Sequence, residues 1–257
     1  MKAGQARVLL TGAAGGIGRA MVEALTARGA QVLGVGRGAD GPGAAWLQAD
    51  VTTAEGQQSI VRAAAGWNAN VVVHAAGVPA FGPLAGVPAE RLQQVLTTNL
   101  LAPMQLTQAL LPQLQRLPRA QIVFVGSVLG RIGLPGFSVY GASKAGLQGF
   151  AEALRRELGD EPVRVQLLAP RTTRTGFNDA AAQAYNDATG AASDTPEQVA
   201  AALVELIESE AAERTLGGAE RVFARLNGLL GARMDSGFAK HRRSLAAPAK
   251  PIPGHRS

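Results

Sequence analysis

Short apolar runs alternate with longer segments of helical spacing along most of the chain. The runs are nearly continuous in apolar residues, which is typical of strands buried on both faces of a sheet. The segments between them carry apolar residues three and four positions apart, as amphipathic helices do. The runs are Arg7–Leu10, Gln31–Val35, Trp46–Ala49, Val71–His74, Gln121–Val125 and Val163–Leu168, and the helical segments are Gly16–Arg28, Ala54–Ala65, Ala89–Leu114 and Ser143–Leu158.

This alternation predicts an α/β protein with a doubly wound parallel β-sheet flanked by helices, the Rossmann arrangement. Beyond Arg171 the pattern weakens, and Arg171–Thr195 has no strong periodicity. Further helices are expected at Pro196–Ser209 and Val222–Leu230, with a very short last strand near Thr215–Leu216.

The composition supports one globular domain. The chain has 257 residues, of which 47% are hydrophobic and 17% charged, and no linker or internal repeat divides it. We expect a single domain over residues 1–238. Residues 239–257 are basic and contain prolines, which predicts a flexible, solvated tail, with contact to an anionic partner or surface as the alternative.

Several classes of protein are excluded or disfavoured. There is no cysteine, so disulfides, thiolate metal sites and cysteine nucleophiles are excluded, and the three histidines lie too far apart to suggest a metal site. The net charge is +6, and the Lys and Arg residues are scattered along the chain except near its end, at Lys240, Arg242, Arg243, Lys250 and Arg256; this distribution argues against nucleic-acid binding. No signal peptide or membrane-spanning stretch is apparent, so we expect a cytoplasmic protein.

The first predicted strand runs directly into a glycine-rich turn, Thr11-Gly12-Ala13-Ala14-Gly15-Gly16-Ile17-Gly18, and then into a helix. Glycines allow a sharp turn and close approach of a ligand, and the N-terminus of the helix attracts an anion. A tight turn without a ligand is the alternative interpretation. The residues expected to bind phosphate are Gly12, Ala14, Gly15, Gly16, Ile17 and Gly18.

A second group of residues carries acid–base chemistry. Tyr140 and Lys144 are four residues apart, so a helix would place them on one face. A nearby ammonium stabilises a phenolate, which predicts a lowered pKa for Tyr140 and a usable acid or base. Ser127 follows the predicted strand that ends at Val125, and taken alone it is alternatively a turn serine.

The spacing T-G-x-x-x-G-x-G and the Y-x-x-x-K motif resemble the short-chain dehydrogenase/reductase superfamily, from about Arg7 to Ala200. The resemblance implies an NAD(P)-dependent oxidoreductase that moves hydride reversibly between a nicotinamide and a carbonyl or alcohol carbon. It implies that Tyr140 is the acid/base, that Lys144 also binds the nicotinamide ribose, and that Ser127 orients the substrate oxygen. Asn99 matches the family's helix asparagine, which holds a water of the proton relay.

The resemblance also indicates the cofactor. NAD-specific relatives usually hold an acidic residue at the position of Gly36, whereas here Arg37 follows, so we expect NADP(H) to be preferred over NAD(H). Arg37 as an ordinary surface charge is the alternative. The Asp50-Val51 pair resembles the adenine contact, and Asp50 is alternatively the cap of the next helix. Further expected cofactor contacts are Ala75, Ala76, Gly77, Asn99, Tyr140, Lys144, Pro170, Thr172 and Thr175.

Two positions in these motifs depart from the family pattern. His74 replaces an asparagine and is expected to be held by structure rather than to act in catalysis. Arg171 replaces a glycine. Arg171 and Arg174 are each interpreted either as ligands for an acidic substrate or phosphate, or as surface residues.

The expected partner is a small carbonyl or alcohol, apolar or mixed in character. That expectation rests on Leu129, Leu134, Phe137 and Phe177. Two other functions stay open: an NAD(P)-using epimerase or dehydratase, and a non-catalytic NADPH-binding regulatory protein. The family's glycine-rich last strand is replaced by Gly217-Gly218, so a homodimer and a homotetramer are equally expected.

Overall fold

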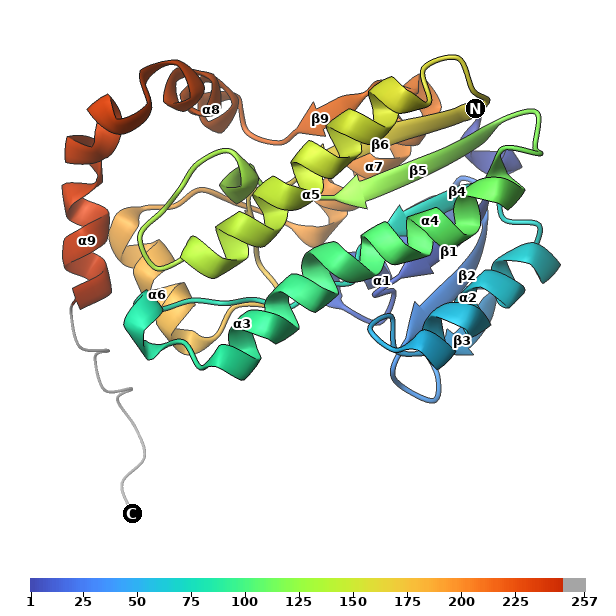
Figure 1. Cartoon of the computed structure of the whole chain (residues 1–257), viewed down its shortest axis with the longest axis horizontal. Coiled ribbons are helices and arrows are strands. Elements are labelled where there is room, and N and C mark those ends of the chain that lie inside the picture. Colours follow the sequence, from blue (N-terminus) through green and yellow to red (C-terminus); the bar gives the residue numbers. More distant parts are fainter. Residues whose placement is uncertain (247–257) are drawn as a thin grey trace.

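The computed structural model describes residues 1–246, and a seven-stranded parallel sheet forms its centre (Figure 1). The strand order is β3-β2-β1-β4-β5-β6-β9, which confirms the predicted doubly wound fold. A separate pair of two-residue strands, β7 and β8, lies beyond the sheet. The strands are β1 (Arg7–Thr11), β2 (Gln31–Gly36), β3 (Ala45–Gln48), β4 (Val71–His74), β5 (Ala120–Val125), β6 (Val163–Ala169), β7 (Thr172–Thr173), β8 (Ser193–Asp194) and β9 (Glu213–Thr215).

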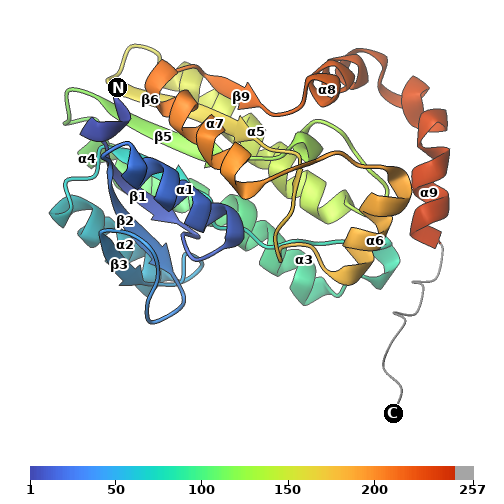
Figure 2. The same cartoon turned by 180° about the vertical axis from the view of Figure 1, so that it is seen from behind.

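Helices cover both faces of the sheet, as Figures 1 and 2 show from opposite sides. Helices α1 and α7 pack on one face, and α2, α4 and α5 pack on the other. The helices are α1 (Gly16–Ala27), α2 (Ala54–Gly66), α3 (Ala89–Leu96), α4 (Ala102–Leu114), α5 (Ser138–Glu157), α6 (Ala180–Thr189), α7 (Pro196–Ser209), α8 (Gly218–Leu230) and α9 (Ala239–Ala246).

Strand β1 shows why the strands are apolar at nearly every position. Val8 and Leu10 join the core beneath α1 and α7, whereas Leu9, which points to the opposite face, joins the core beneath α2, α4 and α5. Both faces are buried, so neither tolerates the alternating polar residues of a half-exposed strand.

The helix expected over 89–114 is interrupted. A π-helical turn, Thr97–Leu101, joins α3 to α4 and contains Asn99. Pro103 has no N–H to donate to the Asn99 carbonyl four residues earlier, so the regular α-helical bond cannot form there. Single π-turns of this kind often occur at functional sites.

Residues 171–195, for which no element was predicted, contain α6 and the small strands β7 and β8. Asp179 caps α6 by accepting a hydrogen bond from the Ala182 N–H at 2.8 Å, and Gly190 ends it with φ 73°. These capping signals were present in the sequence. Periodicity missed the helix because its alanine-rich centre has only a weak apolar stripe.

The tail predicted from residue 239 begins with eight helical residues, and its flexibility stays a prediction. Ala239–Ala246 form α9, which follows a 3-10 segment (Gly231–Phe238) and packs beside α6. His241 Nδ1 lies 2.7 Å from the Tyr185 hydroxyl, a contact that joins α9 to α6. Residues 247–257 of the predicted tail lie outside the described residues. No helix among residues 1–246 is long and apolar enough to cross a bilayer.

Candidate active site

A cavity of about 1130 Å³ lies at the carboxyl edge of the sheet. It runs from the glycine turn after β1, past the ends of β4, β5 and β6, to α6, α8 and α9. Parallel α/β sheets bind ligands at this edge. Every residue expected to contact the cofactor lines the cavity except Asn99: Gly12, Ala14, Gly15, Gly16, Ile17, Gly18, Arg37, Asp50, Val51, Ala75, Ala76, Gly77, Tyr140, Lys144, Pro170, Thr172 and Thr175.

The glycine turn leaves no room for side chains. Gly12 has φ +72°, and a Cβ there would lie 2.7 Å from the Ala76 backbone; a Cβ on Gly18 would lie 2.2 Å from the Gly12 carbonyl oxygen. Gly15, the N-cap of α1, offers no side-chain cap, so the first N–H groups of α1 stay available at the cavity. This cradle fits the pyrophosphate of a dinucleotide.

Thr11, whose role the sequence did not reveal, holds the turn against the end of β4. Its Oγ1 accepts hydrogen bonds from the N–H groups of Ala75 at 3.2 Å and Ala76 at 3.3 Å. The glycine turn and the Ala75–Gly77 segment are therefore fixed relative to each other on neighbouring strands.

At the far end of the cavity, Trp46 occupies the space beside Gly36. A Cβ on Gly36 would lie 2.7 Å from the Trp46 ring, so an acidic side chain does not fit there unless the indole moves. Arg37 lines the same end and is exposed.

Asp50 is ordered by Thr52 rather than used as a helix cap. Its Oδ1 accepts from the Thr52 N–H at 2.8 Å and from the Thr52 hydroxyl at 2.7 Å. Burial opposes ionisation, but these hydrogen bonds and the charge of Arg37 lower the pKa of Asp50. Thr53 caps α2 instead, so the capping interpretation of Asp50 is wrong.

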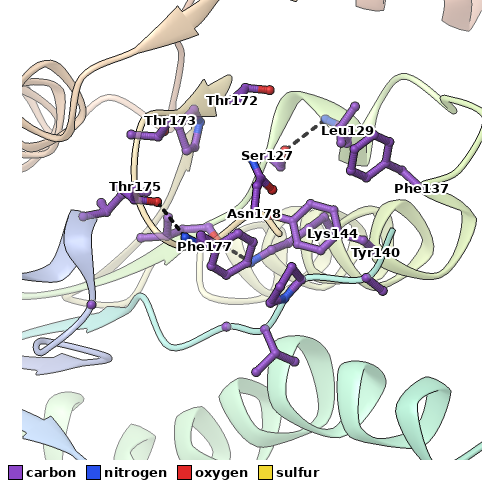
Figure 3. Close-up of a pocket in the computed structure, with 18 of the residues that line it drawn as sticks. Ser127, Leu129, Phe137, Tyr140, Lys144, Thr172, Thr173, Thr175, Phe177 and Asn178 are labelled. Carbon is purple, nitrogen blue, oxygen red and sulfur yellow. Dashed lines mark hydrogen bonds between the residues drawn. The ribbon is translucent and has the colours of Figure 1, made fainter. Parts of the chain in front are cut away.

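The opposite end of the cavity brings together Ser127, Tyr140 and Lys144 (Figure 3). Ser127 follows β5, and the other two lie one turn apart on α5. Lys144 Nζ donates to the Val125 carbonyl at 2.9 Å and lies 5.8 Å from the centre of the Tyr140 ring. Ser127 Oγ accepts from the Leu129 N–H at 3.1 Å, which leaves the serine proton free to be donated.

The pKa of Tyr140 moves opposite to the direction expected from its spacing to Lys144. Burial raises the pKa of Tyr140 to about 12, against a hydrogen bond with Ser127 that lowers it. Burial also lowers the pKa of Lys144 to about 8. At neutral pH the phenol therefore keeps its proton and the amine is mostly charged, which is the state of a proton donor.

Asn99 is fully buried and does not reach the cavity. Its Oδ1 accepts from the Val78 N–H at 2.8 Å, and its Nδ2 donates to the Val78 carbonyl at 3.0 Å and the Ser143 hydroxyl at 3.1 Å. Ser143 in turn donates to the Tyr140 carbonyl at 2.7 Å. The side chain thus joins the segment after β4 to the helix that carries Tyr140.

Comparison with known proteins places these features in a family. Residues 6–186 match the short chain dehydrogenase family. The chain belongs to this family. It is therefore an NAD(P)-dependent oxidoreductase that acts on CH–OH and C=O groups, and the resemblance stated from the sequence is confirmed.

Relatives of this short-chain dehydrogenase cover most of its length. The 3-oxoacyl-(acyl-carrier-protein) reductase FabG of Escherichia coli is 32% identical over 184 residues, which are 67% of this chain and 75% of the relative. A short-chain dehydrogenase from Streptomyces avermitilis has a TM-score of 0.75 at 26% identity and covers 93% of this chain and 98% of its own. A Burkholderia cenocepacia short chain dehydrogenase in complex with NADP also has a TM-score of 0.75, at 26% identity over 86% of this chain and all of its own.

His74 is held by structure in this short-chain dehydrogenase, as the sequence predicted. Its ring stacks on Phe124 with 5.1 Å between ring centres, and Nε2 lies 3.0 Å from the Thr107 hydroxyl. Burial lowers the pKa of His74 to about 3, so the imidazole stays neutral.

Arg171 and Arg174 differ in their surroundings. Arg171 Nε donates to Asp194 at 3.1 Å, and its guanidinium also pairs with Glu220 at 3.4 Å. It is committed to these carboxylates rather than free for a substrate. Arg174 is exposed and donates to the Ser193 hydroxyl at 3.0 Å, which is a surface role.

The wall of the cavity next to Tyr140, at the end away from Arg37, is largely aromatic in this dehydrogenase. The four residues expected there from the sequence, Leu129, Leu134, Phe137 and Phe177, all line it. The sequence missed four more, which lie on α6, on α8, in the 3-10 segment and on α9. A helix was expected near α8, but nothing local indicated that it would reach the cavity, and the other residues lie where no element or only a tail was expected. The four are Tyr185, Phe223, Phe238 and His241.

Proposed function

We propose that the protein is an NADP-dependent reductase of apolar carbonyl compounds, with Tyr140 as the proton donor. One observation carries the proposal. Ser127, Tyr140 and Lys144 meet at one end of a continuous cavity whose other end is the glycine turn. A dinucleotide bound on that turn would have its reactive ring directed toward the tyrosine hydroxyl.

The proposed preference for NADP rests on the end of the cavity that Gly36 and Arg37 line. Trp46 takes up the space that an acidic side chain at position 36 would need, so no carboxylate is there to repel a 2′-phosphate. Arg37 follows on the same wall, and a guanidinium binds phosphate through charge-assisted hydrogen bonds. The Burkholderia relative, which was determined with NADP, supports the same cofactor.

In the proposed mechanism the bound cofactor supplies the hydride that adds to the carbonyl carbon. Tyr140 holds its proton at Oη and transfers it to the carbonyl oxygen, so that the product is an alcohol. Ser127 donates a hydrogen bond to the same oxygen and stabilises the charge that grows there. Lys144, held by the Val125 carbonyl, places a positive charge beside the phenol and is assigned to the nicotinamide ribose hydroxyls.

Asn99 is a positioning residue in this proposal, since its side chain does not touch the cavity. It orients α5 through Ser143 and forms part of the π-turn. Its backbone carbonyl, which Pro103 cannot engage, is available to hold a water of a proton relay to Lys144.

The substrate class follows from the aromatic wall. Phe137 and Phe177 favour an apolar body next to the reactive carbonyl, and the Tyr140 and Phe177 rings lie 6.0 Å apart. The relative in Escherichia coli is named for a 3-oxoacyl group, which is likewise a carbonyl on an apolar chain. We assign this protein to carbonyl compounds of that character.

The test combines a screen of aldehydes, ketones and alcohols with both dinucleotides and the variant Tyr140→Phe. We expect turnover to prefer NADPH, and we expect the variant to lose roughly 10²–10⁴-fold in kcat, the usual contribution of a general acid. NADPH binding, followed by its fluorescence, should persist in the variant and so report that it is folded. Equal turnover by the variant would remove Tyr140 from this role.

The same screen separates the other functions. Steady consumption of NADPH with a carbonyl rules out a binding protein without catalysis, and an epimerase or dehydratase would convert its substrate without net consumption of the cofactor.

The cytoplasmic location and the homodimer or homotetramer stay predictions, and light scattering of the purified chain would measure the oligomeric state.

A further inference from the structure

All of the chain's net charge lies in its last forty residues. Residues 1–217 contain 17 Lys and Arg and 17 Asp and Glu, whereas residues 218–257 contain 8 and 2. The described part of this stretch, residues 218–246, holds α8, the 3-10 segment and α9, and is called the C-terminal arm below. Figures 1 and 2 show the arm at one end of the molecule, with α9 beside α6.

One face of α8 is apolar and exposed. Four of the six large hydrophobic side chains that are exposed within residues 1–246 lie on this helix, and Leu229 is 83% exposed. Their spacing of four, seven and eight residues places them on one stripe of the helix surface. They are Val222, Leu226, Leu229 and Leu230.

The neighbouring face of α8 is already used for packing. Phe223 lies against Phe238 with 6.0 Å between ring centres, Ala224 is buried, and Asn227 donates to the Arg131 carbonyl at 3.0 Å. Helix α8 is therefore fixed to the protein by one side while its leucines face outward.

Four basic residues of the arm, Arg233, Lys240, Arg242 and Arg243, are exposed and lack carboxylate partners within the described residues. Arg233 and Arg243 form no ion pair there; Lys240 donates to the Thr189 carbonyl, and Arg242 donates to the Asp235 carbonyl. A neutral acceptor does not cancel a charge, so the arm keeps its positive field.

We propose that the arm is a peripheral binding surface for an anionic membrane. An exposed leucine stripe on a helix, flanked by basic residues, matches the two parts of a lipid interface, which are acyl chains and anionic headgroups. A second copy of the chain fits less well, because two arms with the same excess of positive charge repel each other. Nucleic acid would satisfy the charges but would leave the leucines in water.

The arm also forms part of the cavity wall through Phe223, Phe238 and His241. Membrane binding would therefore bring the cavity next to lipid, where apolar carbonyl compounds concentrate. This consequence rests on the proposed function, whereas binding to the membrane does not.

The test is sedimentation of the full chain with phosphatidylcholine vesicles, with and without phosphatidylglycerol. We expect binding only to the anionic vesicles and a steep loss of binding as salt is added. The double variant Leu229→Asp/Leu230→Asp should abolish binding. Leu84→Asp, which alters a side chain that is 59% exposed elsewhere on the surface, is the matched control and should bind like the unaltered protein.

A second pair of variants tests the charges. Arg233→Gln/Arg243→Gln should weaken binding about 30-fold, or about fivefold for each charge removed. Arg62→Gln/Arg116→Gln, two exposed arginines outside the arm, should leave it unchanged.

Three results would overturn the proposal. The first is the absence of sedimentation with anionic vesicles at low salt, and the second is equal sedimentation of the Leu229→Asp/Leu230→Asp variant. The third is a lipid-free dimer that this variant dissociates, which would assign the leucine stripe to a second copy. NADPH binding measured on every variant reports that the chain is folded, and it separates failure of the membrane surface from failure of the proposed reductase.

Discussion

Tyr140, Lys144 and His74 are three titratable side chains removed from water, and each is shifted toward its neutral form. Burial raises the pKa of the phenol to about 12 and lowers the pKa of the amine to about 8 and that of the imidazole to about 3. The first two line the cavity, where their protonation states suit a proton donor beside a cation. His74 does not line the cavity, and its neutral ring stacks on Phe124 and hydrogen-bonds with the Thr107 hydroxyl.

Because His74 is buried with a lowered pKa, we expect the free energy of unfolding to fall in mild acid. An unfolded chain binds a proton at this histidine near pH 6.5, whereas the folded protein does so only near pH 3, so the unfolded state binds more protons between these values. Stability should therefore fall as the pH decreases below 6.5, by about 2 kcal/mol between pH 6.5 and 5. Urea unfolding of the protein and of His74→Asn at both pH values measures this. A variant with the same pH slope would contradict the prediction.

Arg37 is predicted to provide the selectivity for the phosphate. A charge-assisted hydrogen bond contributes about 1.5–3 kcal/mol, so Arg37→Ala should raise KM for NADPH roughly 10-fold to 100-fold and leave KM for NADH nearly unchanged. Steady-state kinetics with each dinucleotide measures both constants. An equal effect on the two would mean that Arg37 does not contact the 2′-phosphate.

At the scale of elements, Arg171 connects three segments that are distant in sequence. It follows β6 and pairs with Asp194 on β8 and Glu220 on α8. The side chain of Asp194 is 4% exposed and that of Arg171 22%, so the charges are largely withdrawn from water and depend on each other. This cluster holds the segment that carries α6 and the start of the C-terminal arm against the sheet.

Arg171→Ala should loosen these segments. It leaves the Asp194 carboxylate buried without its cation, which costs about 3–5 kcal/mol, and we expect faster amide hydrogen exchange in residues 172–195 and in α8. Arg174→Ala, on the same segment but exposed, is the control and should exchange at the rate of the unaltered protein. Unchanged exchange in Arg171→Ala would show that the ion pairs do not hold the segment in place.

At the scale of the whole molecule, the cavity joins the two halves of the sheet. Its glycine turn follows the first strand, and its aromatic wall comes from the second half of the chain. A dinucleotide that spans the cavity contacts both halves, so its binding energy adds to the free energy of unfolding.

NADPH should therefore raise the melting temperature. At about 100 times its Kd the stabilisation is about 2.7 kcal/mol, which corresponds to roughly 5–10 °C for a protein of this size. NADH at the same concentration should raise it less. Thermal unfolding followed by fluorescence compares the two, and a larger shift with NADH would contradict the proposed preference.

The sequence by itself determined the strands of the seven-stranded sheet, most of the helices and the glycine turn. These features depend on short-range periodicity and on backbone freedom, and both can be read from neighbouring residues. The spacing of Tyr140 and Lys144 likewise predicted a shared helix face, which α5 confirms.

Only the tertiary structure decided the surroundings of those residues. The pKa of Tyr140 rose where its spacing to Lys144 predicted a fall, because burial depends on chain segments far away in sequence. The partners of Arg171, the aromatic wall that includes Phe238 and the exposed stripe of α8 arise in the same way. Local sequence specifies which element forms, whereas desolvation and side-chain pairing depend on which elements come to lie against one another.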